Sequence, residues 1–427
     1  MNKEQLKLII ISLALLLAVD YSYVHIIVIK FNGSPAIFGN FGYPIGKISY
    51  IRLIYALIII YLLSFVVPLK INSPSSLVLS VYYYVAIVPY LSMFTMNLSA
   101  NSNIYYIDIF NIFIFYLITK FFLNKKYNVV SIIKKEKIDF VSIFIIISSI
   151  FLLVFMYITY GKNSSITFEN LLDVYGQRES FNESAGLLGS LISGYIIYGA
   201  IPFLIFMYKK NNNYLYVIVA LFIGFLTFLT TGSKLFLGST FLTVFLMIKF
   251  RNNFSHSYIG IFLFLLTLFS ITLATSYNSF LLISLFVRRM LVIPAQLFGL
   301  FHEYVNNFGY NYLAAYTSFL TGHNPVSISH EIGNEYYRIG SSANNGIISD
   351  AYANFGLIGV LIYSFLFVFI FKFSDKQNAR YNNLLTPLFV GLAISLTNSS
   401  LLAVFVYQIS MLLIVFQFYN ITKRIKK

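Results

Sequence analysis

Long apolar runs recur from one end of this 427-residue chain to the other, and each is long enough to cross a lipid bilayer as an α-helix. Hydrophobic residues make up 59% of the chain and charged residues only 10%, whereas soluble domains carry roughly a quarter charged residues. The sequence therefore predicts an all-α, polytopic integral membrane protein. We expect residues 1–427 to form a single transmembrane domain.

The apolar runs predict about 12 transmembrane helices. The first run is too long for a signal peptide and has no small-residue cleavage pattern, so we expect no cleavable signal. The last two runs are either two crossings or one re-entrant pair, because only Ser400 separates them. The expected spans are 6–29, 50–67, 76–98, 104–123, 138–160, 188–208, 213–230, 234–249, 258–277, 347–371, 384–399 and 401–420.

Lysine and arginine predict the orientation of these helices. Most of the 29 basic residues lie in or beside the segments on the same side as the N-terminus, which by the positive-inside rule is the cytoplasm. Both termini are then cytoplasmic, and the long segments 161–187 and 278–346 are the third and fifth periplasmic loops. The basic residues sit at helix ends, where they meet lipid headgroups, so the net charge of +15 does not indicate nucleic acid as a partner.

The fifth loop holds much of the scarce polar chemistry, including three of the five histidines. Over 281–305, apolar stretches alternate with Arg288, Arg289, His302 and Glu303. This pattern predicts one or two short helices that lie in the membrane interface. The chain has no cysteine, which excludes disulfides, thiol nucleophiles and cysteine-bound metals.

Both large loops contain an arginine followed eleven residues later by a glycine: Arg178 precedes Gly189, and Arg288 precedes Gly299. Paired motifs of this kind, in the third and fifth periplasmic loops of a protein with about 12 spans, resemble the O-antigen polymerases of the Wzy type. The resemblance covers the topology of the whole chain, while the motifs themselves are short.

The resemblance implies a GT-C-like, inverting glycosyltransferase at the periplasmic face of the bacterial inner membrane. Such an enzyme polymerises oligosaccharide repeat units carried on undecaprenyl pyrophosphate. Arg178 and Arg288 carry over as ligands of the pyrophosphate or glycan. The implied partners are the lipid-linked oligosaccharide, membrane lipids and a separate regulator of chain length, and no cofactor is implied.

The chemistry of these residues fits that role. Guanidinium groups bind pyrophosphate bidentately and stabilise the charge that develops as it leaves. Arg289 is adjacent, and Lys234 follows Thr231-Gly-Ser at the start of a helix whose amides can bind a phosphate oxygen. The plainer alternative is that these cations contact lipid phosphates and that the segment before Lys234 is a helix cap.

A general base that deprotonates an acceptor hydroxyl is expected to be a histidine or a carboxylate. Among the candidates we prefer His330 and Asp350. Neither His-Glu pair of this loop has the partner histidine four residues away that a metal motif needs, so we expect no metal. The candidates are His302, His323, His330, Glu303, Glu331, Glu335 and Asp350.

The run from Asn344 to Gly359 closes the fifth loop. Asp350 and Asn354 fall on one helix face, and Gly356 and Gly359 allow a neighbouring helix or a lipid chain to approach closely. The run is similar to a motif of the related O-antigen ligases, but Asn344 stands in place of the histidine and the spacing is one residue longer. This departure disfavours a ligase.

Asp20 and Asp108 lie within predicted spans, where acids are either functional or hydrogen-bonded to nearby tyrosines. Two alternatives to a polymerase remain. One is a flippase for lipid-linked oligosaccharide, which predicts basic residues inside the bundle and short loops on both faces. The other is an O-antigen ligase.

Overall fold

The computed structural model describes residues 2–31, 46–96, 102–123, 140–161, 174–232, 234–249, 254–314, 328–336, 343 and 346–425. The side chains at 174–180 and 234–238 are among those outside this description. The described chain is almost entirely helical. Its only strands pair antiparallel, Lys70 with Ser255 and Ile71 with Phe254.

Several helices are built from consecutive α-helical and π-helical segments, and η7 is a 3₁₀ helix. The elements are α1 (Lys3–Ser22), η1 (Tyr23–Ile27), α2 (Val28–Phe31), α4 (Tyr50–Leu63), β1 (Lys70–Ile71), α5 (Pro74–Tyr82), η2 (Tyr83–Ile87), α6 (Val88–Met96), α7 (Ser102–Leu123), α8 (Phe140–Met156), η3 (Tyr157–Gly161), α9 (Val174–Gly194), η5 (Tyr195–Ala200), α10 (Ile201–Asn211), α11 (Leu215–Thr231), α12 (Lys234–Lys249), β2 (Phe254–Ser255), α13 (Ser257–Ser276), η6 (Ile283–Val292), α14 (Ile293–Phe308), α16 (Ile328–Tyr336), α17 (Ile347–Arg380), η7 (Thr386–Phe389), α18 (Val390–Ser395), α19 (Leu401–Val404), η8 (Phe405–Ile409) and α20 (Ser410–Ile425).

Nine helices in the described part of the chain are long and apolar enough to cross a membrane, and three shorter apolar helices accompany them. The chain is thus an all-α polytopic membrane protein. Eight of the nine coincide with predicted spans. The nine are Lys3–Phe31, Pro74–Met96, Ile104–Leu123, Phe140–Tyr160, Leu188–Asn211, Ser257–Ser276, Ile283–Phe308, Ile347–Arg380 and Leu401–Asn420.

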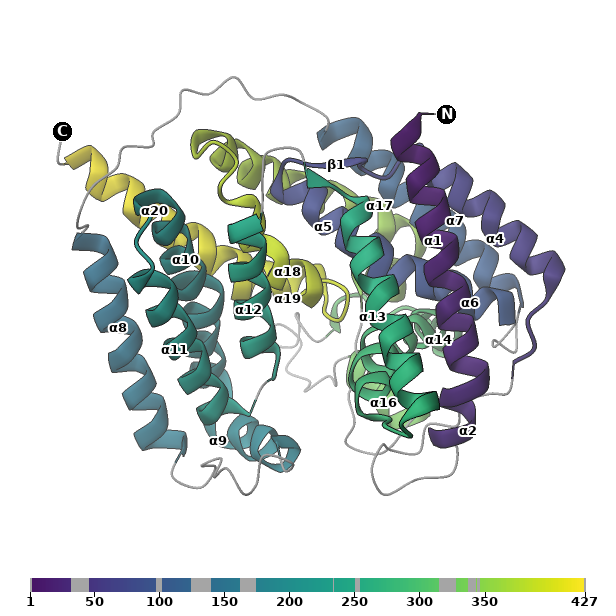
Figure 1. Cartoon of the computed structure of the whole chain (residues 1–427), viewed down its shortest axis with the longest axis horizontal. Helices are drawn as coiled ribbons and strands as arrows, with labels where there is room; N and C mark the ends of the chain where they lie inside the picture. The colour runs from purple at the N-terminus through teal and green to yellow at the C-terminus, as the bar shows by residue number, and fades with distance from the viewer. Residues whose placement is uncertain are drawn as a thin grey trace.

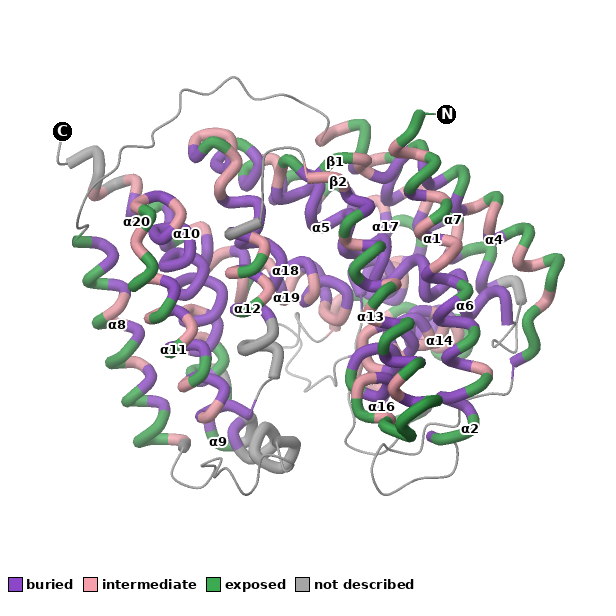
Figure 2. Tube along the Cα trace, viewed as in Figure 1, coloured by how far each residue is buried: buried purple, intermediate pink, exposed green. Residues whose placement is uncertain are grey.

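The helices stand side by side in two groups (Figure 1). Helices α8, α10, α11 and α12 form one group, and α1, α4, α7 and α13 belong to the other, with α5 and α18 between them. Both termini lie at the same end of the helices, and α2, α9 and α16 lie at the opposite end, called here the distal end, with α14 next to α16 on its inner side. Buried residues line the interior of both groups and exposed ones the outside (Figure 2).

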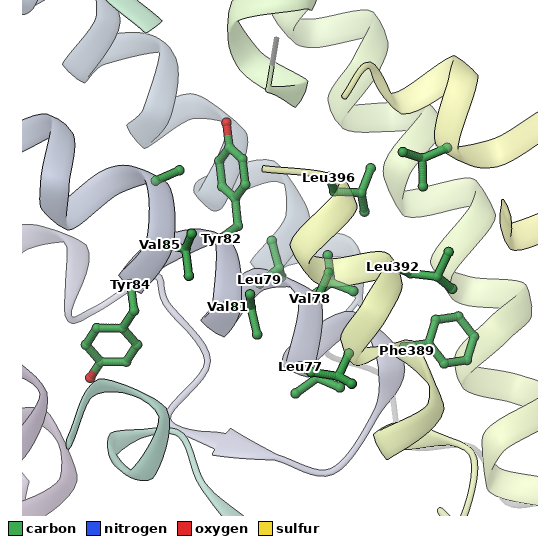
Figure 3. Close-up of a cluster of buried hydrophobic side chains, with 14 of the residues drawn as sticks. Leu77, Val78, Leu79, Val81, Tyr82, Tyr84, Val85, Phe389, Leu392 and Leu396 are labelled. Atoms are coloured by element: carbon green, nitrogen blue, oxygen red, sulfur yellow. The ribbon is translucent and has the colours of Figure 1, made fainter. Parts of the chain in front are cut away.

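The apolar part of the central helix, Pro74–Met96, is completely buried inside the protein. It begins with a capping box, in which the Ser73 side chain accepts a hydrogen bond from the Ser76 amide, and with proline at its first position. Leu77 and Val78 of α5 face Phe389 and Leu392 of the η7–α18 segment (Figure 3). This contact joins the two groups of helices.

Two expectations from the sequence need correction. The one or two short helices predicted over 281–305 are a single continuous helix of 26 residues, Ile283–Phe308, long and apolar enough to cross a membrane. That this segment lies in the membrane interface stays a prediction. The predicted span 384–399 is not a full-length helix: it contains only the short helical segments η7 and α18, with turns on either side. The apolar helix there, Thr386–Ser395, is only about 15 Å long, half of a bilayer core of about 30 Å. The last two apolar runs of the sequence are therefore better described as a re-entrant pair than as two complete crossings.

The helix labelled α17 contains a sharp reversal. Gly356 has φ 61° and ψ −143°, a backbone conformation that side chains with a Cβ rarely adopt. Beyond the reversal the chain packs back on itself, because a Cβ on Gly359 would overlap the carbonyl oxygen of Ala351. The predicted close approach at these two glycines is thus made by the preceding turn of the same segment.

A similar reversal of the chain occurs in α9. Gly186 has φ 51° and ψ −144°, and a Cβ on Gly189 would overlap that of Ala185. Both reversals carry the pattern Gly-Leu-x-Gly, as Gly186-Leu-Leu-Gly and Gly356-Leu-Ile-Gly. Each is followed by a long helix, which ends at Asn211 in one case and at Arg380 in the other.

The substitution Gly356→Ala is expected to lower the free energy of unfolding by about 2 kcal/mol, because a residue with a Cβ is strained in the left-handed backbone conformation. The added Cβ would also lie only 2.7 Å from the Tyr310 hydroxyl. Unfolding in mixed micelles measures the change. Gly299→Ala is the matched control, because a Cβ there has open space within 4 Å and a helical alanine is stabilising by about 0.5–1 kcal/mol relative to glycine. Equal effects of both substitutions would contradict the prediction.

His256, the residue before α13, is fully buried, and its ring stacks on Tyr84 with centroids 5.3 Å apart. Among the residues that the structure describes, neither ring nitrogen has a hydrogen-bond partner. Burial therefore lowers the pKa of His256 to about 4, although the charge of Glu4 opposes this shift. The folded protein holds this histidine neutral.

Stability should consequently fall in mild acid. The pKa of an unfolded histidine is about 6.5, so between pH 6.5 and pH 4 the unfolded chain binds more protons at His256 than the folded chain does. The contribution is complete above pH 6.5 and is lost on acidification by up to about 1.4 kcal/mol per pH unit. His256→Phe keeps the stacking and should flatten the dependence of the unfolding temperature on pH. An unchanged slope in this variant would refute the assignment.

Candidate active site

Two buried ionisable side chains meet near the distal end. The Nδ1 atom of His302, on α14, lies 3.1 Å from Oδ1 of Asp108, on α7, and both side chains are almost inaccessible. The Tyr90 hydroxyl donates a hydrogen bond of 2.5 Å to the other carboxylate oxygen. Burying a carboxylate is costly unless it is hydrogen-bonded, and each oxygen of Asp108 has a hydrogen-bond partner.

The orientation of the imidazole follows from these contacts. A carboxylate only accepts hydrogen bonds, so Nδ1 of His302 carries the proton and Nε2 of the neutral ring is left as the acceptor. The Tyr352 ring stacks on the imidazole, with centroids 4.0 Å apart and an angle of 19°. Within the described part of the chain, the buried Nε2 has no hydrogen-bond partner. A carboxylate-oriented histidine with a bare nitrogen is the arrangement of a general base.

The sequence identified the members of this pair but not the pair. His302 was one of seven candidate bases, and Asp108 was a separate intramembrane acid expected to act or to bond to tyrosine. The bond from Tyr90 confirms the tyrosine partner. Asp108 and His302 are 194 positions apart in the sequence, so no local spacing would reveal the contact. The sequence offered only two separate indications of this pair: an acid within one span and a histidine within another apolar helix.

The two preferred bases lie in different environments. His330 is exposed on α16, whereas Asp350 is 2% exposed in the first turn of α17. The carbonyl oxygen and carboxylate of Asp350 accept hydrogen bonds of 2.8 and 3.4 Å from the Asn354 side chain, which confirms their shared helix face. His323 lies outside the described residues.

The paired arginines of η6 differ in exposure. Arg288 is 1% exposed, donates a hydrogen bond of 3.2 Å to the Ser284 hydroxyl, and stacks over the Phe31 ring at 4.9 Å. Its neighbour Arg289 is only partly buried. Arg288 thus helps to join η6 to α2, and Arg289 is the more accessible guanidinium.

The backbones of Arg178 and Lys234 are placed, but their side chains lie outside the described residues. Arg178 belongs to α9, at the distal end, and Lys234 is the first residue of α12, near that end (Figure 1). The reversal of α9 falls between Arg178 and Gly189. The segments that carry the predicted cationic residues therefore all lie toward the end that holds the Asp108–His302 pair.

Asp20, the other acid within a predicted span, has a structural role. Asp20 is fully buried and accepts hydrogen bonds from the hydroxyls of Ser92 and Thr95 on α6. Among the described residues, no group of three or more His, Asp or Glu side chains is arranged to hold a metal ion.

Comparison with family models, with curated proteins and with solved structures finds no match to this chain.

Proposed function

We propose that this chain is a membrane glycosyltransferase that polymerises oligosaccharide repeat units linked to undecaprenyl pyrophosphate, at the periplasmic face of a bacterial inner membrane. The observation that carries the proposal is the buried Asp108–His302 pair with its bare Nε2. The resemblance of the Arg178 and Arg288 motifs to those of O-antigen polymerases supplies the substrate class. The positive-inside bias of the sequence makes the distal end periplasmic.

The chemistry uses groups that the chain itself supplies. Nε2 of His302 takes the proton of an acceptor sugar hydroxyl as the hydroxyl oxygen attacks the anomeric carbon of the donor. The bond from that carbon to the phosphate oxygen breaks, and the pyrophosphate leaves with the electron pair. Asp108 stabilises the imidazolium that forms. Arg178, Arg289 and Lys234 neutralise the departing charge. Arg288 is a second pyrophosphate ligand according to the resemblance, but it is buried against Ser284 and Phe31, so we assign it instead to holding η6 in place.

A second candidate function is a transporter of the same lipid-linked oligosaccharide. The observation that favours it is the set of interrupted helices, namely the two reversals and the short α18, since transporters often build substrate sites from discontinuous helices. A transporter does not need a proton acceptor at its outer end, which favours the transferase. The two functions give opposite results in the following experiment.

Arg178→Ala and Arg289→Ala are expected to leave single repeat units on the surface glycan in the native host, because export continues while polymerisation fails. Gel separation of the glycan, with membrane insertion measured in parallel, gives the result. Lys30→Ala is the matched control, because Lys30 is an exposed cation near the distal end that stacks on Phe280 at 5.0 Å. Accumulation of lipid-linked units inside the cell would instead establish the transporter, and normal ladders from both arginine variants would show that these cations contact only lipid.

His302→Gln should lower the rate of glycosyl transfer by the purified chain by about 10²–10⁴-fold, the range that general bases contribute. Asp108→Asn should lower it less, because the base stays but its orientation and charge partner are weakened. Transfer is measured with lipid-linked repeat units, and gel filtration verifies that each variant is folded. A folded His302→Gln variant with full activity would eliminate His302 as the base and return the choice to His330 and Asp350.

A further inference from the structure

Four aromatic rings continue outward from the Asp108–His302 pair. Tyr352 stacks on His302, and Tyr310 meets Tyr352 with centroids 6.3 Å apart. Tyr310 also contacts Tyr312 at 6.0 Å, and Tyr312 contacts Phe355 at 5.9 Å. Tyr310 is 42% exposed and Tyr312 is 61% exposed. We call Tyr310, Tyr312, Tyr352 and Phe355 the aromatic shelf.

The backbone beneath the shelf is held in a costly conformation. Tyr312 and Leu313 have φ angles of 52° and 59°, in the left-handed region that non-glycine residues avoid. The side-chain oxygen of Asn354 accepts a hydrogen bond of 2.9 Å from the Leu313 amide, and the backbone carbonyl oxygen of Asn354 accepts one of 3.2 Å from the Tyr312 amide. Strain that neighbouring residues maintain in this way is concentrated at functional sites.

The reversal at Gly356 fixes the inner edge of the shelf. The Tyr310 hydroxyl lies where a side chain at residue 356 would begin, 2.7 Å from the position of a Cβ. The Asn311 amide donates a hydrogen bond of 3.0 Å to the Ala353 carbonyl. The shelf is therefore positioned by the same segment, 347–356, that places Tyr352 on the imidazole.

The geometry points to the aromatic shelf as a subsite that stacks the pyranose rings of the glycan and leads them to His302. Aromatic faces are electron-rich and attract the polarised C–H groups on one face of a sugar ring. Tyrosines at a membrane interface are common as lipid anchors. An anchor, however, needs neither a strained backbone nor a path of rings that ends at a buried base. This inference rests on the proposed function, because the sugar is the substrate of the same site.

The absence of tryptophan from the chain allows a direct test. Tyr312→Trp places a single fluorescent reporter on the shelf of the full-length protein. The probe is the free oligosaccharide repeat unit, released by mild acid from the lipid-linked precursor of the native host. We expect a saturable change in emission with Tyr312→Trp and none with Tyr277→Trp, a control at an exposed tyrosine (77%) just after α13. Adding Tyr310→Ala to Tyr312→Trp should weaken binding about 2- to 12-fold. A silent Tyr312→Trp reporter, or the same change in both single variants, overturns the inference.

A glycine substitution separates binding from packing. Tyr312→Gly removes the ring but also removes the left-handed strain, so the unfolding temperature should stay the same or rise while affinity for the oligosaccharide falls. Affinity for this variant, which lacks the reporter, is measured by saturation-transfer NMR. A lower unfolding temperature with unchanged affinity would make the ring a packing residue only.

The two proposals fail in distinguishable ways. If the shelf binds the oligosaccharide while folded His302→Gln polymerises at full rate, the base assignment is wrong and the shelf stands as a sugar-binding surface. If His302→Gln abolishes polymerisation while the Tyr312→Trp reporter stays silent, the transferase stands and the shelf is overturned.

Discussion

Hydrogen bonds to the central helix, Pro74–Met96, hold this structure together. Within a membrane the burial of apolar side chains gains little over contact with lipid, so helices associate through close packing and polar contacts. The central helix is completely enclosed and has polar contacts along its length. These are Ser75 with Asp375 of α17, Leu79 with Tyr116 of α7, Tyr83 with Ser12 of α1, Tyr90 with Asp108 of α7, and Ser92 with Asp20 of α1.

The candidate site depends directly on this arrangement. Tyr90 belongs to the central helix and supplies the hydrogen bond that fixes Asp108, which in turn orients His302. Phe298, one turn before His302 on α14, packs on the Tyr90 ring with centroids 4.7 Å apart. The pair is thus assembled from the consecutive helices α6 and α7 together with α14, which is distant from both in sequence. Its geometry is a consequence of how the helices pack, whereas the aromatic shelf is a consequence of how one short segment turns.

Hydropathy was sufficient to predict the helical class and the position of most spans, because an apolar run of about 20 residues has few other folds in a membrane. It failed where charges interrupt a run. Arg288 and His302 made 283–308 read as a loop, yet both are buried, one against Ser284 and Phe31 and the other against Asp108. Phe31 and Asp108 belong to other helices, and a local pattern does not contain such partners.

The candidate site could be predicted only in parts. Its residue types were visible, since acids and histidines are scarce in this chain, but the pairing of Asp108 with His302 comes from tertiary contact. The glycines of 356–359 were noticed for close approach, whereas the reversal that they make depends on φ angles that no residue spacing reports. The polymerase activity, its lipid-linked substrate and the roles of Arg178 and Lys234 remain predictions.

The reversal at Gly356 has a consequence for biogenesis. The helix that follows it, 357–380, is apolar enough to partition into the bilayer as it leaves the translocation machinery. The short segment 347–354 is only about 12 Å long and carries Ser349, Asp350 and Asn354, so it is both too short and too polar to enter lipid alone. It contacts α7 and α14, so we expect it to take its place after these helices have assembled. We therefore expect the end of the molecule that holds the histidine to be completed after the spans are in the membrane.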